Sequence, residues 1–308
     1  MTWTSNDIPD LHGKTALVTG GNSGIGYWTG LHLALAGAHV VMACRSMPRA
    51  QSALADLLKA VPNGQFEILQ MDLSDQASVR SAAETFRSKH DRLDILCNNA
   101  GIALTPMERT KDGFESQLAA NFLGHFALTG LLVELIRATP NSRVAHVGSL
   151  AHRLGKLDFK DPNFTHRKYS PMTAYSQSKL ANVMFMLELQ RRFQGASINA
   201  ISVGAHPGMS GTNIGAALVE NASPLRKKIN AWTEARILNS PERAAEPTLL
   251  AVTRPEVTGG SYFGPSGLME IKGSPAPARI ATAAQNESDA SQLWQLAEQL
   301  TGVSFLDD

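Results

Sequence analysis

Two residues of one predicted helix could carry acid–base chemistry. Tyr175 and Lys179 are four positions apart in a stretch, Ala174–Phe193, that we expect to be helical, so their side chains share one face. A tyrosine hydroxyl has a pKa of about 10 in water, and a neighbouring ammonium group lowers it by favouring the phenolate. Because a single Tyr-x-x-x-Lys pattern also arises by chance, a packed tyrosine and a solvated lysine are the alternative.

A serine follows the predicted strand Arg143–Val147, at the strand's carboxyl end, where ligands of parallel sheets bind. Ser149 lies just past this strand, and its hydroxyl could hydrogen-bond the oxygen of a substrate. Together with Tyr175 and Lys179, Ser149 forms a set suited to moving a proton to or from a carbonyl or alcohol oxygen.

A glycine-rich turn is suited to binding a pyrophosphate. It reads T-G-G-N-S-G-I-G over Thr19–Gly26, between a predicted strand, Thr15–Thr19, and a predicted helix, Gly24–Ala36. Glycines let a backbone approach phosphate closely, and a helix N-terminus offers free N–H groups and a partial positive charge. A turn without a ligand is the alternative. The residues expected to bind the pyrophosphate are Gly20, Asn22, Ser23, Gly24, Ile25 and Gly26.

The end of the second predicted strand, His39–Ala43, indicates which dinucleotide binds. NAD sites usually present an Asp or Glu there for the ribose hydroxyls. In this chain Cys44, Arg45 and Ser46 follow, with no acid. Arg45 could instead pair with the 2′-phosphate of NADP, whereas a solvated surface arginine is the alternative. We therefore predict NADP(H) rather than NAD(H), with Arg45 and Ser46 at the adenosine end.

Short apolar runs alternate with longer amphipathic stretches over the first two-thirds of the chain, which predicts a parallel sheet with helices on both faces. Strands are expected at Thr15–Thr19, His39–Ala43, Glu67–Gln70, Leu93–Cys97, Arg143–Val147 and Ser197–Val203, with a last one at Ser261–Phe263. Helices are expected at Gly24–Ala36, Ala50–Val61, after an N-cap at Ser74, over most of Gly113–Leu135, at Ala174–Phe193, and from Ser288 to Gly302. Ligands of such sheets bind beyond the carboxyl ends of the strands, where the motifs lie.

The predicted fold class is α/β: a single Rossmann-type doubly wound parallel sheet flanked by helices, with a C-terminal substrate flap and a terminal helix. We expect residues 1–308 to form one dinucleotide-binding catalytic domain, with the flap at about 206–240 and a C-terminal extension at 265–308. No run of about 18 apolar residues occurs, so no membrane anchor is expected.

The composition excludes several classes of partner. The net charge of +1 gives no indication of a nucleic-acid partner. Cys44 and Cys97 form no Cys-x-x-Cys pair, which argues against a disulfide scaffold and suits a cytoplasmic protein. No metal is expected, because His152 and His206 stand beside the predicted site without ligand-spaced partners.

Taken together, these motifs resemble the short-chain dehydrogenase/reductase family over about residues 12–265. Asn98–Gly101 is similar to its N-N-A-G motif, and Pro207-Gly208 with Thr212 is similar to its P-G-x-x-x-T motif. The catalytic residues that the resemblance implies are Asn121, Ser149, Tyr175 and Lys179. The further cofactor-binding residues that it implies are Asp72, Leu73, Asn98, Ala100, Gly101, Tyr175, Lys179, Pro207, Gly208 and Thr212.

A narrower resemblance is to the retinol-dehydrogenase-like branch. It rests on four short segments: Ala43–Arg45, Ser149–His152, Tyr175–Asn182 and His206–Gly208. The family likeness implies an NADP(H)-dependent enzyme that interconverts a ketone or aldehyde and an alcohol.

The same likeness assigns a role to each catalytic residue. Tyr175 exchanges the proton, and Lys179 lowers the pKa of Tyr175 and holds the nicotinamide ribose. Ser149 orients the carbonyl group, and Asn121 holds a water that links Lys179 to solvent.

Other functions stay open at this point. The first is a non-catalytic dinucleotide sensor or scaffold on the same fold. The second is an epimerase or dehydratase that shares Tyr-x-x-x-Lys, and the third is a light-driven tetrapyrrole reductase. The moderately apolar segment Met209–Trp232 suggests a lipophilic small-molecule substrate. The apolar stretches Phe122–Ile136 and Val183–Leu189 would suit a homodimer or homotetramer, although burial in the core explains them equally well.

Overall fold

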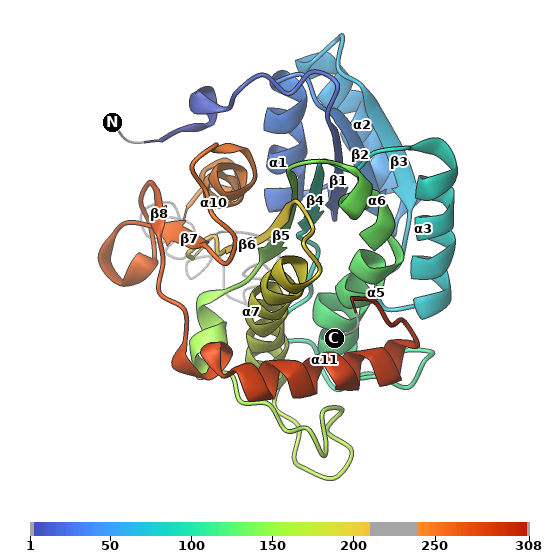
Figure 1. The fold of residues 1–308 in the computed structure, drawn as a ribbon, viewed down its shortest axis with the longest axis vertical. Coiled ribbons are helices and arrows are strands. Elements are labelled where there is room, and N and C mark those ends of the chain that lie inside the picture. Colours follow the sequence, from blue (N-terminus) through green and yellow to red (C-terminus); the bar gives the residue numbers. More distant parts are fainter. Residues whose placement is uncertain (1–2, 210–238, 307–308) are drawn as a thin grey trace, which may run out of the picture.

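A twisted eight-stranded sheet forms the centre of the computed structural model, which describes residues 3–209 and 239–306 (Figure 1). Its strands are β1 (Thr15–Thr19), β2 (His39–Cys44), β3 (Phe66–Gln70), β4 (Ile95–Asn98), β5 (Ser142–Val147), β6 (Ala200–Ala205), β7 (Tyr262–Pro265) and β8 (Pro275–Pro277). Their order is β3-β2-β1-β4-β5-β6-β7-β8. The α/β class and the doubly wound sheet are therefore confirmed.

The edge of the sheet differs from the prediction. All neighbouring strands from β3 to β7 run parallel, but β8 runs antiparallel to β7, so the sheet is mixed. The expected last strand, Ser261–Phe263, corresponds to β7, and β8 was missed. Two of the three residues of β8 are prolines, which deprive it of the sequence signal of a strand.

Helices cover both faces of the sheet, each over its own apolar core. The helices on one face are α1 (Gly24–Leu35), α2 (Met47–Ala60) and α10 (Pro241–Thr253). The helices on the other face are α3 (Gln76–Lys89), α5 (Gly124–Leu131) and α7 (Pro171–Gly195). Burial on both faces explains why the central strands are almost continuously apolar; every residue of β1, for example, is buried.

The predicted helix over Gly113–Leu135 is broken into pieces. The structure has α4 (Ser116–Leu118), a π-helical turn (Ala119–Leu123), α5 and then α6 (Val133–Ala138). A π-turn inserts an extra residue into a helix, and such turns are frequent at functional sites. Here it contains Asn121.

Two predicted helix caps are wrong by one or two residues. Asp75, not Ser74, caps α3 and accepts hydrogen bonds from the N–H groups of Ala77 and Ser78. Asn286, not Ser288, caps α11 (Glu287–Thr301). Gly302 ends α11 in the left-handed conformation at φ 63°, as expected. Of the predicted flap, about residues 206–240, only 206–209 and 239–240 fall within the described residues.

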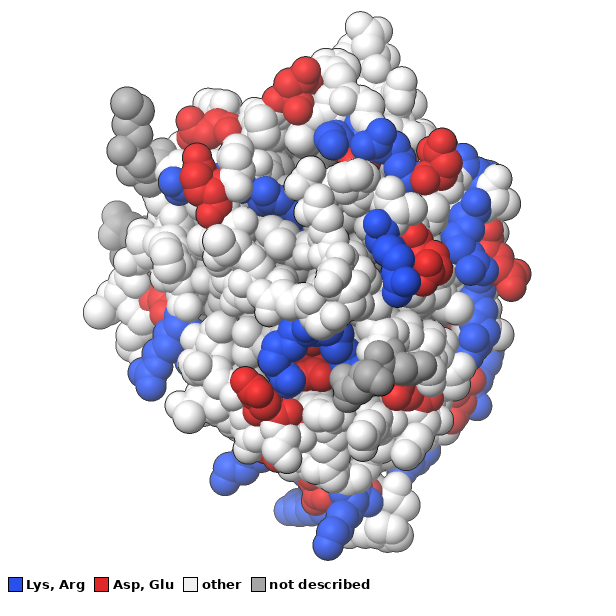
Figure 2. Space-filling view, viewed as in Figure 1, with Lys and Arg blue, Asp and Glu red and all other residues white. Residues whose placement is uncertain are grey.

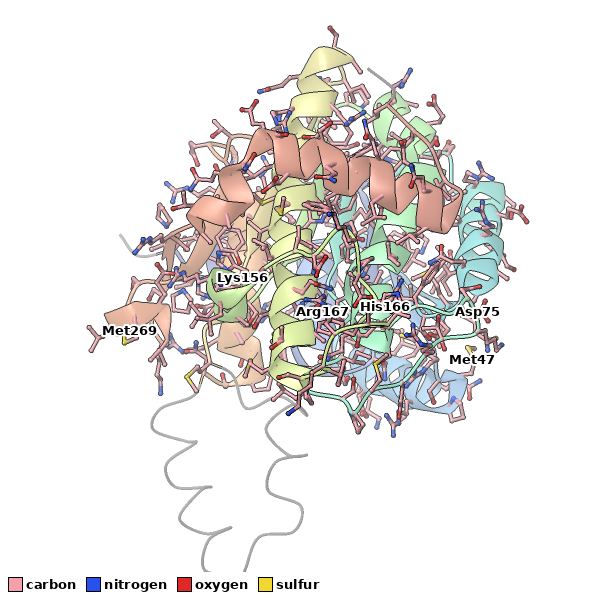
Figure 3. All side chains as sticks on the ribbon, turned by 90° about the horizontal axis from the view of Figure 1, so that it is seen from below. Met47, Asp75, Lys156, His166, Arg167 and Met269 are labelled. Carbon is pink, nitrogen blue, oxygen red and sulfur yellow. The ribbon has the colours of Figure 1, made fainter. Side chains whose placement is uncertain are left out.

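The terminal helix α11 lies across α5 and α7 (Figures 1 and 3). The ring of Trp294 packs edge-on against Phe126 at 5.0 Å, and Phe305 packs against Trp294 at 4.6 Å. The apolar stretches that would suit subunit contacts are thus covered at these points by the chain's own C-terminal segment. The oligomeric state stays a prediction.

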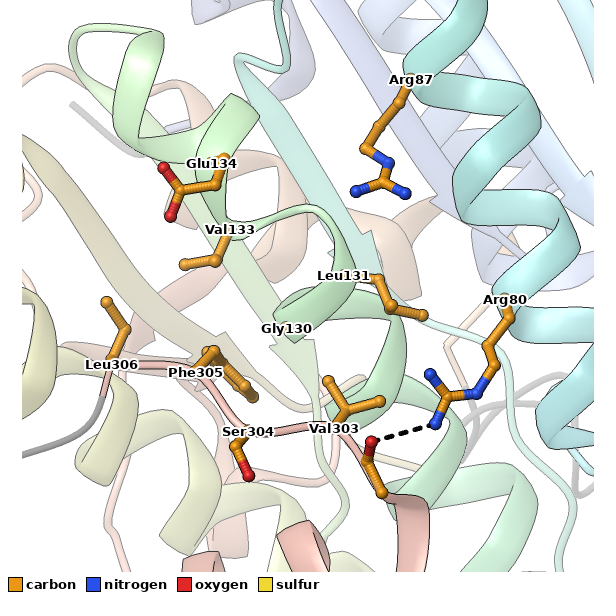
Figure 4. A pocket seen from close by; sticks show the side chains of 11 residues that line it. Arg80, Arg87, Gly130, Leu131, Val133, Glu134, Val303, Ser304, Phe305 and Leu306 are labelled. Atoms are coloured by element: carbon orange, nitrogen blue, oxygen red, sulfur yellow. Dashed lines mark hydrogen bonds between the residues drawn. The ribbon is translucent and has the colours of Figure 1, made fainter.

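A surface groove of about 390 Å³ lies between α3, α5, α6 and the chain after α11 (Figure 4). The guanidinium of Arg80 donates to the carbonyl oxygens of Thr301 at 2.7 Å and Gly302 at 3.1 Å. Arg80 therefore satisfies carbonyl groups at the end of α11. None of the predicted site residues lines the groove.

The surface agrees with the near-neutral composition. Figure 2 shows acidic and basic side chains intermixed over the visible face, with wide uncharged areas between them. Among the described residues, no helix is both long enough and apolar enough to cross a membrane.

Candidate functional site

The glycine turn joins β1 to α1 at the carboxyl edge of the sheet. Gly20 and Gly24 have φ angles of 68° and 54°, which favour glycine. A Cβ atom on Gly26 would lie 2.4 Å from the carbonyl oxygen of Gly20, so only glycine fits there. Ser23, the N-cap of α1, makes no side-chain hydrogen bond to the first turn. The first-turn N–H groups are thus available to an anion, and the turn fits a pyrophosphate.

Asn99 braces this turn from the neighbouring strand. Its side-chain amide donates to the carbonyl oxygen of Thr19 at 2.7 Å. The Thr19 hydroxyl oxygen accepts from the N–H groups of Asn99 and Ala100, both at 2.9 Å. Asn99 lies within the predicted motif Asn98–Gly101, from which Asn98, Ala100 and Gly101 were predicted to bind the cofactor. The Asn98 side chain is buried and donates to Thr129 at 3.1 Å, away from the glycine turn.

The residues predicted for the adenosine end lie at the same edge of the sheet. The N–H groups of Gly21 and Asn22 hydrogen-bond the thiol of Cys44, which places the end of β2 against the glycine turn. Arg45 follows directly and is exposed. Ser46 caps α2 without a side-chain hydrogen bond.

The loop after β3 brings Asp72 and Leu73 to this edge. One carboxylate oxygen of Asp72 accepts from the N–H of Ser74 at 2.9 Å and from its hydroxyl at 2.6 Å. Leu73 is buried, and a Cβ atom on Gly124 would lie 2.3 Å from its carbonyl oxygen. The close approach of α5 therefore fixes the backbone of this loop.

Tyr175 and Lys179 lie on α7, which begins at Pro171 after an N-cap at Ser170. The Lys179 ammonium nitrogen is 5.9 Å from the centre of the Tyr175 ring and donates to the carbonyl oxygen of Val147 at 2.9 Å. Burial lowers the pKa of Lys179 to about 8. Burial also raises the pKa of Tyr175, and a hydrogen bond with Ser149 opposes that shift. The net shift of the Tyr175 pKa is therefore upward, whereas a neighbouring ammonium was predicted to lower it. The reason is that desolvation disfavours the charged phenolate.

Asn121 is held by protein groups on both sides of its amide. Its oxygen accepts from the N–H of Ile102 at 2.8 Å, and its nitrogen donates to the Ile102 carbonyl and to the Ser178 hydroxyl, both at 2.9 Å. A Cβ atom on Gly101 would lie 3.1 Å from the Asn121 amide oxygen and 3.5 Å from the Lys179 nitrogen. The structure therefore brings Asn121, Gly101 and Lys179 together. The Asn121 side chain thus braces the loop at Ile102 against α7, and its role in holding a water stays a prediction.

A buried histidine, missed by sequence analysis, connects the π-turn to β1. His125 donates through Nδ1 to the carbonyl oxygen of Asn121 at 2.9 Å. Burial lowers the pKa of His125 to about 4, so the ring is neutral. Its Nε2 therefore accepts from the Thr19 hydroxyl at 2.9 Å. This chain of hydrogen bonds joins the glycine turn to the segment that carries Asn121.

Pro207 and Gly208 follow β6 and are held by the C-terminal extension. Gly208 has a φ of 70°, and a Cβ atom on it would lie 2.2 Å from the carbonyl oxygen of Ile271. The Gly208 N–H donates to Nδ1 of His206 at 3.1 Å, so Nε2 of His206 donates to Glu270, at 2.8 Å. Asn239 donates to the Pro207 carbonyl at 3.0 Å. Thr212 lies outside the described residues.

Glu270 is the second residue that sequence analysis missed here, and no sequence signal marks it. Its carboxylate also pairs with Arg153 and accepts from the N–H of Arg279 at 3.2 Å. His206 is fully buried, and burial lowers its pKa to about 4. His152, the other histidine beside the site, donates to the Ser149 carbonyl and accepts from the N–H of Ala281. Both rings are thus engaged by protein groups.

Comparisons with known proteins agree with this geometry. The family model for short chain dehydrogenase matches residues 14–223. Human Retinol dehydrogenase 13 is 37% identical over 295 residues, which cover 95% of this chain and 86% of that protein. Mouse Retinol dehydrogenase 14 is 34% identical over 307 residues, which cover 95% of this chain and 87% of that protein.

A solved structure supports the same assignment over the whole chain. The crystal structure of an uncharacterized protein from Mycobacterium paratuberculosis has a TM-score of 0.82 and 37% identity, and the match covers 99% of both chains. The chain therefore belongs to the short-chain dehydrogenase family, in which it is retinol-dehydrogenase-like, and it is an oxidoreductase of carbonyl and alcohol groups that uses a nicotinamide dinucleotide.

Proposed function

We propose that this chain uses NADP(H) to interconvert a lipophilic ketone or aldehyde and the corresponding alcohol, and that residues 1–308 act as one catalytic domain. The observation that carries the proposal is the contact of Tyr175 with Ser149, next to Lys179, on the same edge of the sheet as the glycine turn. When bound, the dinucleotide supplies or accepts the hydride.

Each residue of this group has a separate task in the proposed reaction. The hydroxyl of Tyr175 gives a proton to the substrate oxygen during reduction and takes it back during oxidation. Ser149, which hydrogen-bonds that hydroxyl, holds the same substrate oxygen. Lys179 holds the nicotinamide ribose and, below its pKa of about 8, brings a positive charge towards the phenol. Because burial alone raises the pKa of Tyr175, that positive charge is needed to offset it.

The preference for NADP rests on the end of β2. Arg45 is exposed beside the glycine turn, and no acidic residue stands at this strand end to bind the ribose hydroxyls. An arginine binds a phosphate through charge-assisted hydrogen bonds, which would favour the 2′-phosphate of NADP.

The proposal of a lipophilic substrate rests on exposed apolar side chains close to Gly208. Met209, Leu268 and Met269 are 47%, 89% and 73% exposed, and Met269 projects outward (Figure 3). The Met209 N–H donates to the Ile271 carbonyl at 3.0 Å, so the backbone at Met209 lies beside the end of the turn Leu268–Glu270. Relatives are named for retinol, a lipophilic alcohol.

The experiment measures NADPH and NADH consumption with retinal, aromatic ketones and short polar aldehydes. We expect turnover with NADPH and a lipophilic carbonyl. Arg45→Ala should raise the KM for NADPH about tenfold, the loss of about 1.4 kcal/mol of phosphate binding, and leave the KM for NADH unchanged. Arg87→Ala, which removes an arginine of α3, is the matched control. Tight NADPH binding without turnover on any carbonyl would favour a non-catalytic sensor instead.

A further inference from the structure

Two histidines and a glutamate meet at the amino-terminal edge of the sheet, opposite the edge that carries the glycine turn. His39 begins β2, Glu67 is the second residue of β3, and His90 directly follows α3. The parallel register pairs Val41 with Glu67. Because side chains alternate along a strand, His39, Val41 and Glu67 share the face that α3 covers.

The three side chains point their ligand atoms at one another. Nε2 of His39 lies 3.1 Å from one carboxylate oxygen of Glu67, and Nε2 of His90 lies 3.5 Å from the other. One ligand atom from each residue falls within 4.8 Å of the other two. Two ligands of a tetrahedral zinc ion stand about 3.4 Å apart, given metal–ligand distances of about 2.0–2.2 Å. The spacing therefore needs little change to admit an ion.

Packing holds the two rings in place. The His90 side chain is only 8% exposed, and its ring centre lies 4.5 Å from that of Phe86 and 5.3 Å from that of His39. The His39 and Glu67 side chains are 23% and 34% exposed, which leaves a path for an ion and for a water ligand.

Other histidine–carboxylate pairs of the described residues lack a third ligand. His12 pairs with Asp10 at an exposed position, and His32 lies 3.4 Å from Glu242. Neither of these pairs, nor the His206–Glu270 pair, belongs to a group of three. We propose that His39, Glu67 and His90 bind one divalent ion of the zinc class, which ties β2 and β3 to the end of α3.

Imidazole and carboxylate ligands set the class of metal. Two nitrogen donors and one oxygen donor suit zinc, whereas magnesium prefers oxygen donors alone. Lys89 pairs with Glu67: its ammonium nitrogen lies 3.9 Å from the carboxylate, and its side chain is 57% exposed. Lys89 can swing into solvent when an ion binds, but its charge competes for Glu67. Removing this charge, as in Lys89→Gln, should therefore strengthen zinc binding.

The test uses the full-length chain without an affinity tag and measures zinc by isothermal titration and by metal analysis after dialysis. We expect one equivalent of zinc for the wild type and no response to magnesium. His39→Gln and Glu67→Gln should each weaken zinc binding at least about tenfold, since each removes a ligand. Lys89→Gln should tighten it. His12→Gln, which removes a histidine from a two-ligand pair, should leave it unchanged.

Thermal unfolding gives a second readout that does not depend on activity. Zinc at about 100 times its Kd should raise the Tm by about 4 °C in the wild type and in His12→Gln, but not in His39→Gln. Wild-type zinc affinity in both ligand variants, or the absence of zinc binding by the wild type, would overturn the proposal. If Glu67→Gln does not fold, the other two variants still test the proposal: zinc affinity should fall in His39→Gln and rise in Lys89→Gln.

Discussion

Glu270 is expected to hold the nicotinamide end of the site in place from outside it. The perturbation is Glu270→Ala, with Glu270→Gln as a variant that keeps the shape but loses the charge. In the structure the carboxylate, whose side chain is 21% exposed, accepts from His206 and pairs with Arg153. Its removal leaves the Nε2–H of the fully buried His206 without an acceptor. His206 in turn accepts the N–H of Gly208.

The magnitude follows from these contacts. An unsatisfied buried donor costs about 1–3 kcal/mol, and a hydrogen bond to a charged group is worth about 1.5–3 kcal/mol. Allowing for partial exposure, Glu270→Ala should lower the free energy of unfolding by about 3 kcal/mol. For a chain of this length that is a fall in Tm of about 5 °C. Glu270→Gln should lie between this variant and the wild type, because its amide oxygen can still accept from His206.

The assay compares thermal unfolding with steady-state kinetics. Glu256→Ala is the matched control, since Glu256 pairs with Arg254 at 3.0 Å on the exposed surface. This control should change neither stability nor kinetics appreciably. Glu270→Ala should also raise the KM for NADPH about tenfold, if about 1.4 kcal/mol of the lost interaction falls on Gly208. Equal Tm and KM values for Glu270→Ala and Glu256→Ala would show that Glu270 does not hold His206 and Gly208 in place.

Two further predictions concern the glycine turn and the buried lysine. Gly26→Ala should weaken NADPH binding more than about tenfold, because its Cβ would lie 2.4 Å from the Gly20 carbonyl oxygen. The control Gly195→Ala, which has open space around its Cβ, should leave NADPH binding unchanged. Dinucleotide fluorescence titration measures NADPH binding by both variants. Lys179→Met should lose activity but gain about 1–3 kcal/mol of stability at pH 7, because burial lowers the pKa of Lys179 from 10.5 to about 8. Between pH 8 and pH 10.5 the lysine is protonated in the unfolded wild type but largely neutral in the folded protein. The wild-type free energy of unfolding therefore rises with pH over this range, and the stability gained by Lys179→Met disappears. Denaturant unfolding at pH 7 and pH 10 measures this change, and an equal gain at both would contradict it.

Sequence patterns predicted most of the sheet because its central strands are buried on both faces and therefore read as apolar runs. The elements that were missed lack such patterns. Helix α10 contains Pro247 inside it, and β8 is Pro275–Pro277. The break in the helix around Asn121 is a matter of backbone hydrogen bonding that apolar periodicity does not report.

The candidate site divides in the same way. Tyr175 and Lys179 could be selected because four positions on one helix form a local pattern. His125 and Glu270 could not, because their roles come from contacts with residues far along the chain. The direction of the Tyr175 pKa also needed the structure, since burial, which opposes the effect of a neighbouring charge, cannot be read from spacing.

In the proposed reaction the Tyr175 hydroxyl transfers the proton to and from the substrate oxygen. The most direct measurement is single-turnover oxidation of NADPH by Tyr175→Phe, alongside NADPH binding measured by fluorescence. We expect nearly unchanged NADPH binding and a loss of turnover of at least about 100-fold, within the range that a positioned general acid contributes. Turnover at the wild-type rate in this variant, with NADPH bound, would contradict this role of Tyr175.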